Sequence, residues 1–306
     1  MRLDCRCLIL AAGKGTRLLP VTQYVPKPLF PILNTPALDS LLIKLRSEGL
    51  YEIAINTHHL APNMKRWHKL SHAAADTLLI EEKSLLDTGG AIKNAFNIMG
   101  MDKPILVHNG DVVSNIDIRK IVRIFCDRPD ISALFCLHNN PRFNKVELVN
   151  SKITSFDAKG KSCLAYTGVA LFRPECFLDA PNGPFPLIPH MECLIKRGMH
   201  IAACRAEELT KDGQQWFWHD IGTPCGYLAA NLSLLDQKGL TTYMEDCMIE
   251  KKVYVKQNVI IGKGAQIRGT VELKNVVIWP DTKLYSEDVK LSESILTPFG
   301  NLYCNR

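Results

Sequence analysis

The chain has 306 residues, of which 46% are apolar, and its 37 basic and 31 acidic side chains leave a net charge of +6. This length suits one large domain, or one with a small second domain, around a sizeable core. The charge surplus is mild and the basic residues form no clustered arm, which favours a small anionic ligand over nucleic acid as the partner.

The apolar runs are too short to span a membrane and the N-terminus lacks a signal-peptide pattern, so we expect no membrane association. The eleven cysteines are scattered, without a CxxC pair that has a matching partner. We interpret them as reduced thiols, which indicates a cytoplasmic protein without disulfides or a cysteine metal site.

Up to about residue 235, short apolar runs alternate with helical patterns. The runs predict strands at 7–12, 52–56, 77–82 and 105–111, and several lack polar alternation, as strands buried on both faces do. Leucines at helical spacing predict a helix within residues 35–50 that ends at Gly49. This order indicates an α/β fold with a Rossmann-like, mixed but mainly parallel sheet flanked by helices.

Three later segments carry more local alternation of apolar and polar residues. They predict added strands, some of them antiparallel, that form one wall of a cleft, at 131–138, 145–150 and 163–172.

From Ile249 onward the chain repeats with a period of six. The first and fifth positions of each hexad are apolar except at Lys283, and they are Ile249, Val253, Val255, Val259, Ile261, Ala265, Ile267, Val271, Leu273, Val277, Trp279, Lys283, Tyr285, Val289, Leu291 and Ile295. This period predicts a short parallel β-helix, with a small meander of hairpins as the alternative. We therefore predict two domains, 1–240 and 241–306.

Residues 8–31 read LILAAGKGTRLLPVTQYVPKPLFP, a predicted strand followed by a glycine loop and a lysine between two prolines. Gly13 and Gly15 allow a phosphate to approach backbone N–H groups closely. Arg17 can grip phosphate oxygens with its planar fork, and Lys27 adds a compact charge. The loop lacks the ending of a Walker loop and the third glycine of a dinucleotide fingerprint. Taken alone, it could equally be an ordinary turn.

Two carboxylates follow other predicted turns, Asp111 in HNGD and Asp220 in WHDIGTP. Asp111 closes a predicted strand, and ligands bind at the carboxyl ends of strands in open sheets. Each aspartate alone could be a turn or cap residue. As a pair from separate segments, they suit a Mg²⁺ ion that takes waters and phosphate oxygens as its other ligands.

The combination of Gly-x-Gly-Thr-Arg, Pro-x-Thr and Pro-Lys-Pro at this spacing resembles the sugar-1-phosphate nucleotidylyltransferases, the NDP-sugar pyrophosphorylases. The resemblance covers residues 7–235, and the tail is similar to the left-handed β-helix that many members carry. The resemblance implies that the protein converts an NTP and a sugar 1-phosphate into an NDP-sugar and pyrophosphate, with Mg²⁺ as cofactor. We expect a homo-oligomer, because the exposed coil ends of a β-helix carry unpaired backbone groups that another subunit can cover.

The resemblance also implies roles for individual residues. The catalytic residues would be Arg17, Lys27 and Asp111, with Asp111 and Asp220 as metal ligands. The nucleotide would contact Leu10, Ala11, Ala12, Gly13, Lys14, Gly15, Thr16, Arg17, Thr88 and Gly89. The sugar phosphate would contact Lys27, Gly90, Asn109, Thr167 and Gly168.

The sequence departs from the family before the Thr-Gly segment, where many members have Glu-Lys-Pro and this chain has none. Lys161 could substitute there. The LAAG start of the loop favours a pyrimidine base, because Ala12 crowds the base edge slightly. The chain looks most like N-acetylmuramate-1-phosphate uridylyl or mannose-1-phosphate guanylyl enzymes, which the sequence does not separate. The alternatives are a non-catalytic regulatory subunit that binds a nucleotide sugar, and a tail with acyltransferase activity.

Overall fold

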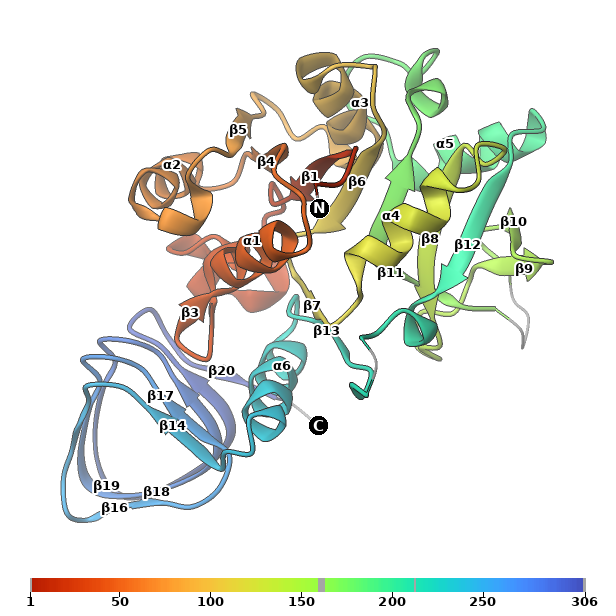
Figure 1. Cartoon of the computed structure of the whole chain (residues 1–306). Coiled ribbons are helices and arrows are strands. Elements are labelled where there is room, and N and C mark those ends of the chain that lie inside the picture. The colour runs from red at the N-terminus through yellow and green to blue at the C-terminus, as the bar shows by residue number, and fades with distance from the viewer. Residues whose placement is uncertain (1, 159–162, 212, 305–306) are drawn as a thin grey trace. The chain divides into compact units, whose positions relative to one another are not determined.

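The computed structural model describes residues 2–158, 163–211 and 213–304 (Figure 1). The chain forms two compact units, and each is made of two separate segments. The first unit combines Met1–Gly13 with Leu41–Phe217, and the second combines Lys14–Ser40 with Trp218–Arg306. The boundary predicted at residue 240 falls inside the second unit, so the division into domains 1–240 and 241–306 stays a prediction.

The first unit is built on a sheet in which nine described strands follow the order β5-β4-β1-β6-β11-β8-β12-β10-β9. β4, β1, β6 and β5 form parallel pairs, as do β8 and β12, whereas β11 runs antiparallel between β6 and β8. The strands are β1 (Arg6–Leu10), β4 (Ile53–Thr57), β5 (Leu78–Glu81), β6 (Ile105–Asn109), β8 (Ala133–His138), β9 (Glu147–Val149), β10 (Lys152–Ser155), β11 (Ala165–Phe172) and β12 (Ile201–Arg205). The predicted mixed, mainly parallel α/β sheet and its antiparallel additions are therefore confirmed.

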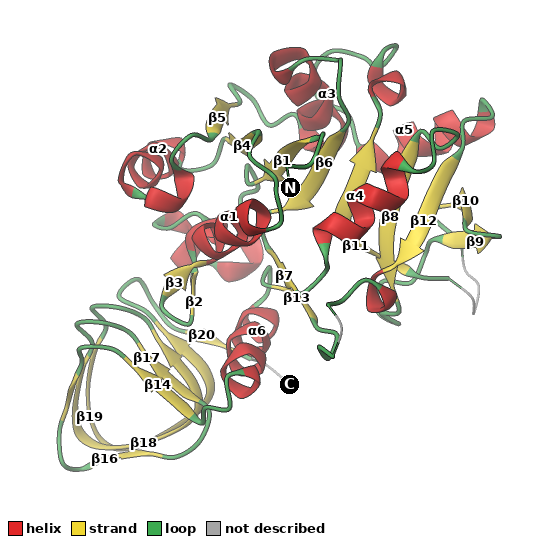
Figure 2. Cartoon of the chain, in the orientation of Figure 1, coloured by secondary structure: helices red, strands yellow, loops and turns green. Residues whose placement is uncertain are grey.

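Helices cover both faces of this sheet (Figure 2). α3 (Asp87–Met99) and α5 (Leu187–Lys196) lie behind it and contribute to the large apolar core around Phe135 and Phe172. α4 (Ile118–Cys126) lies in front of it, and its buried residues recur every three or four positions. Two further helices, α1 (Ala37–Ser47) and α2 (Ala61–Leu70), precede β4 and β5 along the chain. α1 confirms the helix predicted within residues 35–50.

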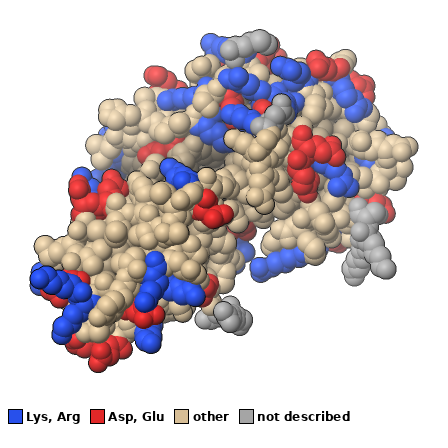
Figure 3. Space-filling view, turned by 60° about the horizontal axis from the view of Figure 1, so that its bottom comes forward, with Lys and Arg blue, Asp and Glu red and all other residues tan. Residues whose placement is uncertain are grey.

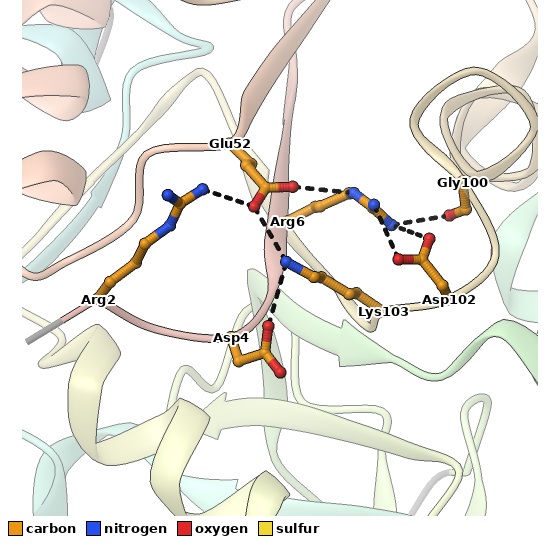
Figure 4. A network of polar contacts seen from close by, with 7 residues as sticks. All are labelled: Arg2, Asp4, Arg6, Glu52, Gly100, Asp102 and Lys103. Carbon is orange, nitrogen blue, oxygen red and sulfur yellow. Dashed lines mark hydrogen bonds and ion pairs between the residues drawn. The ribbon is translucent and has the colours of Figure 1, made fainter.

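A polar network joins the starts of three parallel strands (Figure 4). The Glu52 carboxylate, just before β4, accepts hydrogen bonds from Arg2, Arg6 and Lys103 at 2.7, 3.2 and 3.1 Å. Arg6 in β1 also forms an ion pair of 2.7 Å with Asp102, just before β6. The network therefore lies at the edge of the sheet opposite to the carboxyl ends of these strands.

The second unit contains a curled sheet in which seven described strands pair mostly in parallel. Its strands are β14 (Thr242–Met244), β15 (Met248–Ile249), β16 (Val253–Val255), β17 (Val259–Ile261), β18 (Gln266–Ile278), β19 (Lys283–Leu296) and β20 (Leu302–Tyr303), of which β20 alone pairs antiparallel. α6 (Pro224–Gln237) precedes it. Short strands also form at β2 (Pro31–Ile32), β3 (Thr35–Pro36) and β13 (Trp218–Asp220) in this unit, and at β7 (Val112–Ser114) in the first unit.

The hexad frame read from the sequence holds as far as Leu273, is shifted by one residue from Val276 to Leu284, and is in register again at Val289 and Leu291, which pair with Val271 and Leu273. Val253 pairs with Val271, eighteen residues on, but Val259 pairs with Val276, seventeen residues on. Val276 and Ile278 consequently join the core of the curled sheet, and Tyr285, a predicted core position, is 54% exposed. The frame was wrong there because one coil is a residue shorter than three hexads.

The surface that Figure 3 shows carries basic and acidic side chains interspersed on a largely neutral background. Among the described residues, we find no helix with the length and apolar character that crossing a membrane requires.

We predict that Glu52→Gln lowers the free energy of unfolding by about 1 kcal/mol at neutral pH, because it removes the acceptor shared by three cations at a largely solvated site. Hydrogen bonds from Lys103 and Arg2 hold the pKa of Glu52 below its usual value of 4.5. A lowered carboxyl pKa stabilises the fold above the unfolded pKa, and this contribution is lost as the pH falls through the folded pKa.

Urea unfolding of both proteins at about pH 7 and about pH 3 checks this. Glu81→Gln, which breaks a single exposed ion pair with Lys65, is the control and should change stability less. An equal deficit of Glu52→Gln at both pH values would contradict the prediction.

Candidate active site

One group of predicted site residues lies where β1 and β6 end side by side in the first unit. Leu10 and Asn109 are register partners, and the Gly110 N–H donates to the Leu10 carbonyl at 2.9 Å. The turn that carries Asp111 therefore lies directly beside the segment that begins the glycine loop. The carboxyl edge of parallel strands is where ligands bind in open α/β sheets.

Asn109 also contacts β11. Gly168 has φ +85°, and a Cβ placed on it would lie 2.8 Å from the Asn109 side-chain nitrogen. Thr167 is fully buried, and its hydroxyl donates to the Cys136 carbonyl at 2.8 Å. The structure thus brings Asn109 and Gly168 together at the edge of the sheet. The hydroxyl of Thr167, by contrast, forms a hydrogen bond from β11 to β8.

The DTGG turn forms the first residues of α3. Gly89 and Gly90 are buried there, and a Cβ on Gly90 would lie 2.3 Å from the Gly183 carbonyl oxygen, while one on Gly89 would lie 2.4 Å from the Phe185 ring. The Gly90 N–H donates to the Phe185 carbonyl at 3.2 Å. These glycines allow close packing of the helix start, and Thr88 is the partly exposed member of the three predicted positions.

A buried polar bridge, which the sequence analysis missed, connects this turn to the glycine loop. The Ala11 N–H donates to Asn56 Oδ1 at 2.7 Å, and Asn56 Nδ2 donates to Glu82 Oε1 at 2.7 Å. Glu82 Oε2 in turn accepts the Leu86 N–H at 3.1 Å. Asn56 and Glu82 are each 4% exposed. The signal in the sequence was a polar residue at the end of each of two apolar strand patterns.

His108 lies in β6 and is almost fully buried. Burial lowers the pKa of His108 to about 4, so its ring is neutral at neutral pH. Its Nδ1 lies 2.8 Å from the Asn109 carbonyl oxygen, which fixes Nδ1 as the protonated nitrogen. His108 therefore orients the backbone carbonyl of Asn109 and adds no charge to this edge of the sheet.

A separate group of predicted site residues belongs to the second unit and centres on Gly15. Gly15 has φ +64°, and a Cβ there would lie 2.8 Å from Thr22 Cγ2 and 3.5 Å from Lys27 Cβ. The Thr22 hydroxyl donates to the Gly15 carbonyl at 3.0 Å. The three motifs of the sequence thus meet in space, and Thr22 explains why the Pro-x-Thr part accompanies the glycine loop.

Arg17 and Asp220 face each other in this second unit. Arg17 Nη2 lies 4.0 Å from Asp220 Oδ2, and the Gly222 N–H donates to Asp220 Oδ1 at 2.7 Å. The Arg17 side chain is 57% exposed, so its fork is accessible to a ligand. Lys14 and Thr16 flank Gly15, and Thr16 opens the 3-10 turn Thr16–Leu18 that contains Arg17.

The donor set fits a hard divalent cation. Asp220 Oδ1 accepts the Gly222 N–H and Oδ2 lies 4.0 Å from Arg17 Nη2, and carboxylate oxygens are ligands that Mg²⁺ prefers. In the described part of the chain no cluster of three or more His, Cys, Asp or Glu could hold a metal. An ion here would therefore need phosphate or water oxygens as well. Asp111 lies in the first unit and Asp220 in the second, so their joint ligation stays a prediction, and Lys161 lies outside the described residues.

A mainly parallel sheet with glycine turns and a carboxylate at its carboxyl edge is typical of α/β proteins that bind ligands at that edge. The family model described as nucleotidyl transferase matches residues 6–237, and the chain belongs to this family.

Two curated relatives and one solved structure illustrate the similarity. The N-acetylmuramate alpha-1-phosphate uridylyltransferase of Neisseria meningitidis is 29% identical over 228 residues, covering 72% of this chain and 94% of the relative. The UTP–glucose-1-phosphate uridylyltransferase of Synechocystis is 28% identical, covering 83% of this chain and 69% of that protein. HddC from Yersinia pseudotuberculosis, crystallised with GMP-PN, has the same fold, with a TM-score of 0.62 at 23% identity, covering 75% of this chain and 99% of HddC.

We predict that Asn56→Ala destabilises the protein by about 2–4 kcal/mol, because it leaves the buried Glu82 carboxylate and the Ala11 N–H without their partner. Chemical unfolding followed by circular dichroism measures this. The exposed Asn301 offers the matched control, and Asn301→Ala should change stability by less than about 0.5 kcal/mol. A similar loss in both variants would refute the role of the bridge.

Proposed function

We propose that this protein is a sugar-1-phosphate nucleotidylyltransferase, which makes an NDP-sugar and pyrophosphate from an NTP and a sugar 1-phosphate. The observation that carries the proposal is that Lys27 lies beside the glycine loop at Gly15, and that Arg17 of the same loop lies 4.0 Å from Asp220. Membership in the nucleotidyl transferase family and relatives named as sugar-1-phosphate uridylyltransferases support it.

The chemistry needs little proton transfer, because the attacking oxygen of a sugar 1-phosphate is already an anion at neutral pH. The obstacle is repulsion between two polyanions, and the attacking oxygen must be held in line with the leaving group. Arg17 and the loop N–H groups would hold the β- and γ-phosphates that leave. Lys27 would offset the charge that develops between the α-phosphate and the sugar phosphate.

Asp111 and Asp220 would hold a Mg²⁺ ion. When bound, such an ion offsets the negative charge on the phosphate oxygens. Among the remaining predicted contacts, Leu10, Ala11, Ala12, Gly13, Thr88 and Gly89 would enclose the nucleotide, and Asn109, Gly168 and Gly90 would approach the sugar phosphate. Thr167 would contribute through its backbone, since its hydroxyl bonds to Cys136.

For the substrates, we propose UTP with N-acetylmuramate 1-phosphate as the first pair to test. Two relatives from different bacteria carry that activity in their names, at 29% and 26% identity. The LAAG start of the loop, in which Ala12 is buried, favours a pyrimidine as well. GTP with mannose 1-phosphate is the second pair, and the complex of HddC with GMP-PN favours it.

We further propose that the curled sheet is a short left-handed parallel β-helix, since its parallel strands pair at offsets of seventeen and eighteen residues. Homo-oligomerisation and a cytoplasmic location remain part of the proposal, the latter supported by eleven free cysteines. The alternative is a regulatory subunit that binds a nucleotide sugar without turnover. An acyltransferase activity of the tail is a further alternative.

The test is a screen for pyrophosphate release with Mg²⁺, in which UTP, GTP, dTTP, CTP and ATP are each combined with a panel of sugar 1-phosphates. We expect turnover with one NTP and one sugar class. Binding of an NDP-sugar without turnover of any pair would favour the regulatory subunit.

We predict that Asp111→Asn lowers kcat by about 10²-fold or more while the fold is retained, because it removes a carboxylate of the ion site. Pyrophosphate release and circular dichroism measure the two effects. Asp127→Asn, at the exposed end of α4, should leave activity unchanged. Near-normal turnover of Asp111→Asn would remove Asp111 from the metal site.

For Lys27→Ala we expect a larger effect on the sugar 1-phosphate than on the NTP. The KM for the sugar 1-phosphate should rise and kcat should fall, whereas NTP affinity from calorimetry should change by less than about tenfold. The exposed Lys69 on α2 provides the control variant Lys69→Ala. An equal loss of affinity for both substrates would move Lys27 out of this role.

A further inference from the structure

The segment around Lys27 is anchored to the C-terminal part of the chain on both of its sides within the second unit. Before Lys27, the ring of Tyr24 stacks on Phe299 at 5.1 Å between centroids. After Lys27, Asn34 Nδ2 donates to the Ile261 carbonyl at 3.1 Å. The C-terminal sheet and the segment that follows it thus hold the two ends of this basic segment.

The central anchor is the ring of Phe30. It meets Trp279 edge-on, with centroids 4.7 Å apart at 82°, and Tyr227 of α6 at 5.6 Å and 84°. Phe30 and Tyr227 are fully buried and Trp279 is 4% exposed. Trp279 Nε1 donates to the Tyr227 hydroxyl at 2.9 Å, and that hydroxyl donates to the Pro31 carbonyl. The three rings and the backbone after Phe30 therefore form one bonded cluster.

This cluster is connected to the lysine by a single backbone hydrogen bond. The Phe30 N–H donates to the Lys27 carbonyl at 3.0 Å and closes the 3-10 turn Lys27–Leu29. On its other side, Lys27 Cβ lies 3.5 Å from the place of a Cβ on Gly15. A shift of Phe30 would therefore move the lysine relative to the glycine loop.

Trp279 packs on Phe30 because the hexad frame is shifted by one residue in this coil. Trp279 occupies a first position of the sequence repeat, but Ile278 takes the core position of that coil instead. The Trp279 N–H donates to the Leu296 carbonyl at 2.9 Å, which holds its backbone in the curled sheet. The indole consequently packs on Phe30 and not on the core of the sheet.

We propose that the C-terminal sheet is a positioning part of the active site, with Trp279 and Tyr227 setting the place of Lys27 through Phe30. This role rests on the proposed function, because it concerns use of the sugar 1-phosphate. Trp279 and Tyr227 act as positioning residues and do not touch the substrate. The tail then serves the reaction in addition to stabilising the chain.

The experiment compares Trp279→Ala, Tyr227→Phe and Trp279→Phe with Leu273→Ala in the full chain. Leu273 is fully buried in the core of the curled sheet, so Leu273→Ala weakens the tail without removing a ring from Phe30. All variants are studied at a temperature at which circular dichroism shows them folded. The readouts are kcat and KM for each substrate, and the rate at which acetic anhydride acylates Lys27, measured by mass spectrometry with Lys69 as the internal reference.

We expect Trp279→Ala to lower kcat/KM for the sugar 1-phosphate by about 10²-fold, because small misplacements of a positioning element cost about that much. Tyr227→Phe should lose about tenfold, and Trp279→Phe, which keeps a ring against Phe30, should recover most of the loss. The acylation rate of Lys27 should rise in Trp279→Ala. Leu273→Ala should change neither the kinetics nor the acylation.

Unchanged acylation of Lys27 in Trp279→Ala would overturn the proposal, whatever the kinetics. Equal effects of Leu273→Ala and Trp279→Ala would also overturn it, because they would reduce the tail to a stabilising element. If the wild-type protein releases no pyrophosphate with any substrate pair, the proposed function fails, and the acylation rates still decide whether Trp279 positions Lys27.

Discussion

The packing of Phe30 between Tyr227 and Trp279 is the contact on which the basic part of this site depends. Edge-to-face aromatic pairs add a geometric preference to the burial of large apolar surfaces. Here that preference fixes a short segment whose own secondary structure is a single 3-10 turn. Because a loop of this kind has little intrinsic rigidity, its geometry must come from what it packs against. Side chains from α6 and the curled sheet supply it.

The group of predicted site residues in the first unit depends on a different kind of constraint, the register of parallel strands. Leu10 and Asn109 are partners across β1 and β6, so the two turns that follow them emerge together at one edge. The buried bridge through Asn56 and Glu82 then fixes the glycine loop relative to the start of α3. Buried polar groups of this kind are costly unless every partner is present, which makes the bridge specific as well as stabilising.

Local patterns predicted much of this fold. The apolar strands of the sheet, the helix near residues 35–50 and the presence of antiparallel strands among the later segments followed from periodicity and turn residues. The glycine loop and its companion motifs identified the part of the chain that converges on Gly15. Patterns could not identify Thr22, Asn56 or Glu82 as partners, because their hydrogen bonds join segments that are distant along the chain or lie on different elements. The hexad frame failed from Val276 to Leu284 because a coil can lose a residue while the sequence still looks periodic.

The sequence by itself determined the class of chemistry: backbone N–H groups at a glycine loop, two cations and two aspartates suit phosphate groups and a hard metal ion wherever they stand. It also determined the parallel sheet, since strands buried on both faces must be apolar throughout. Only the tertiary structure decided that residues 14–40 belong with the C-terminal segment, and that an indole from the repeat holds Phe30. The physical reason is that the whole fold decides which backbone segments lie within contact distance of a side chain. Local propensity depends only on neighbouring residues and therefore does not specify such contacts.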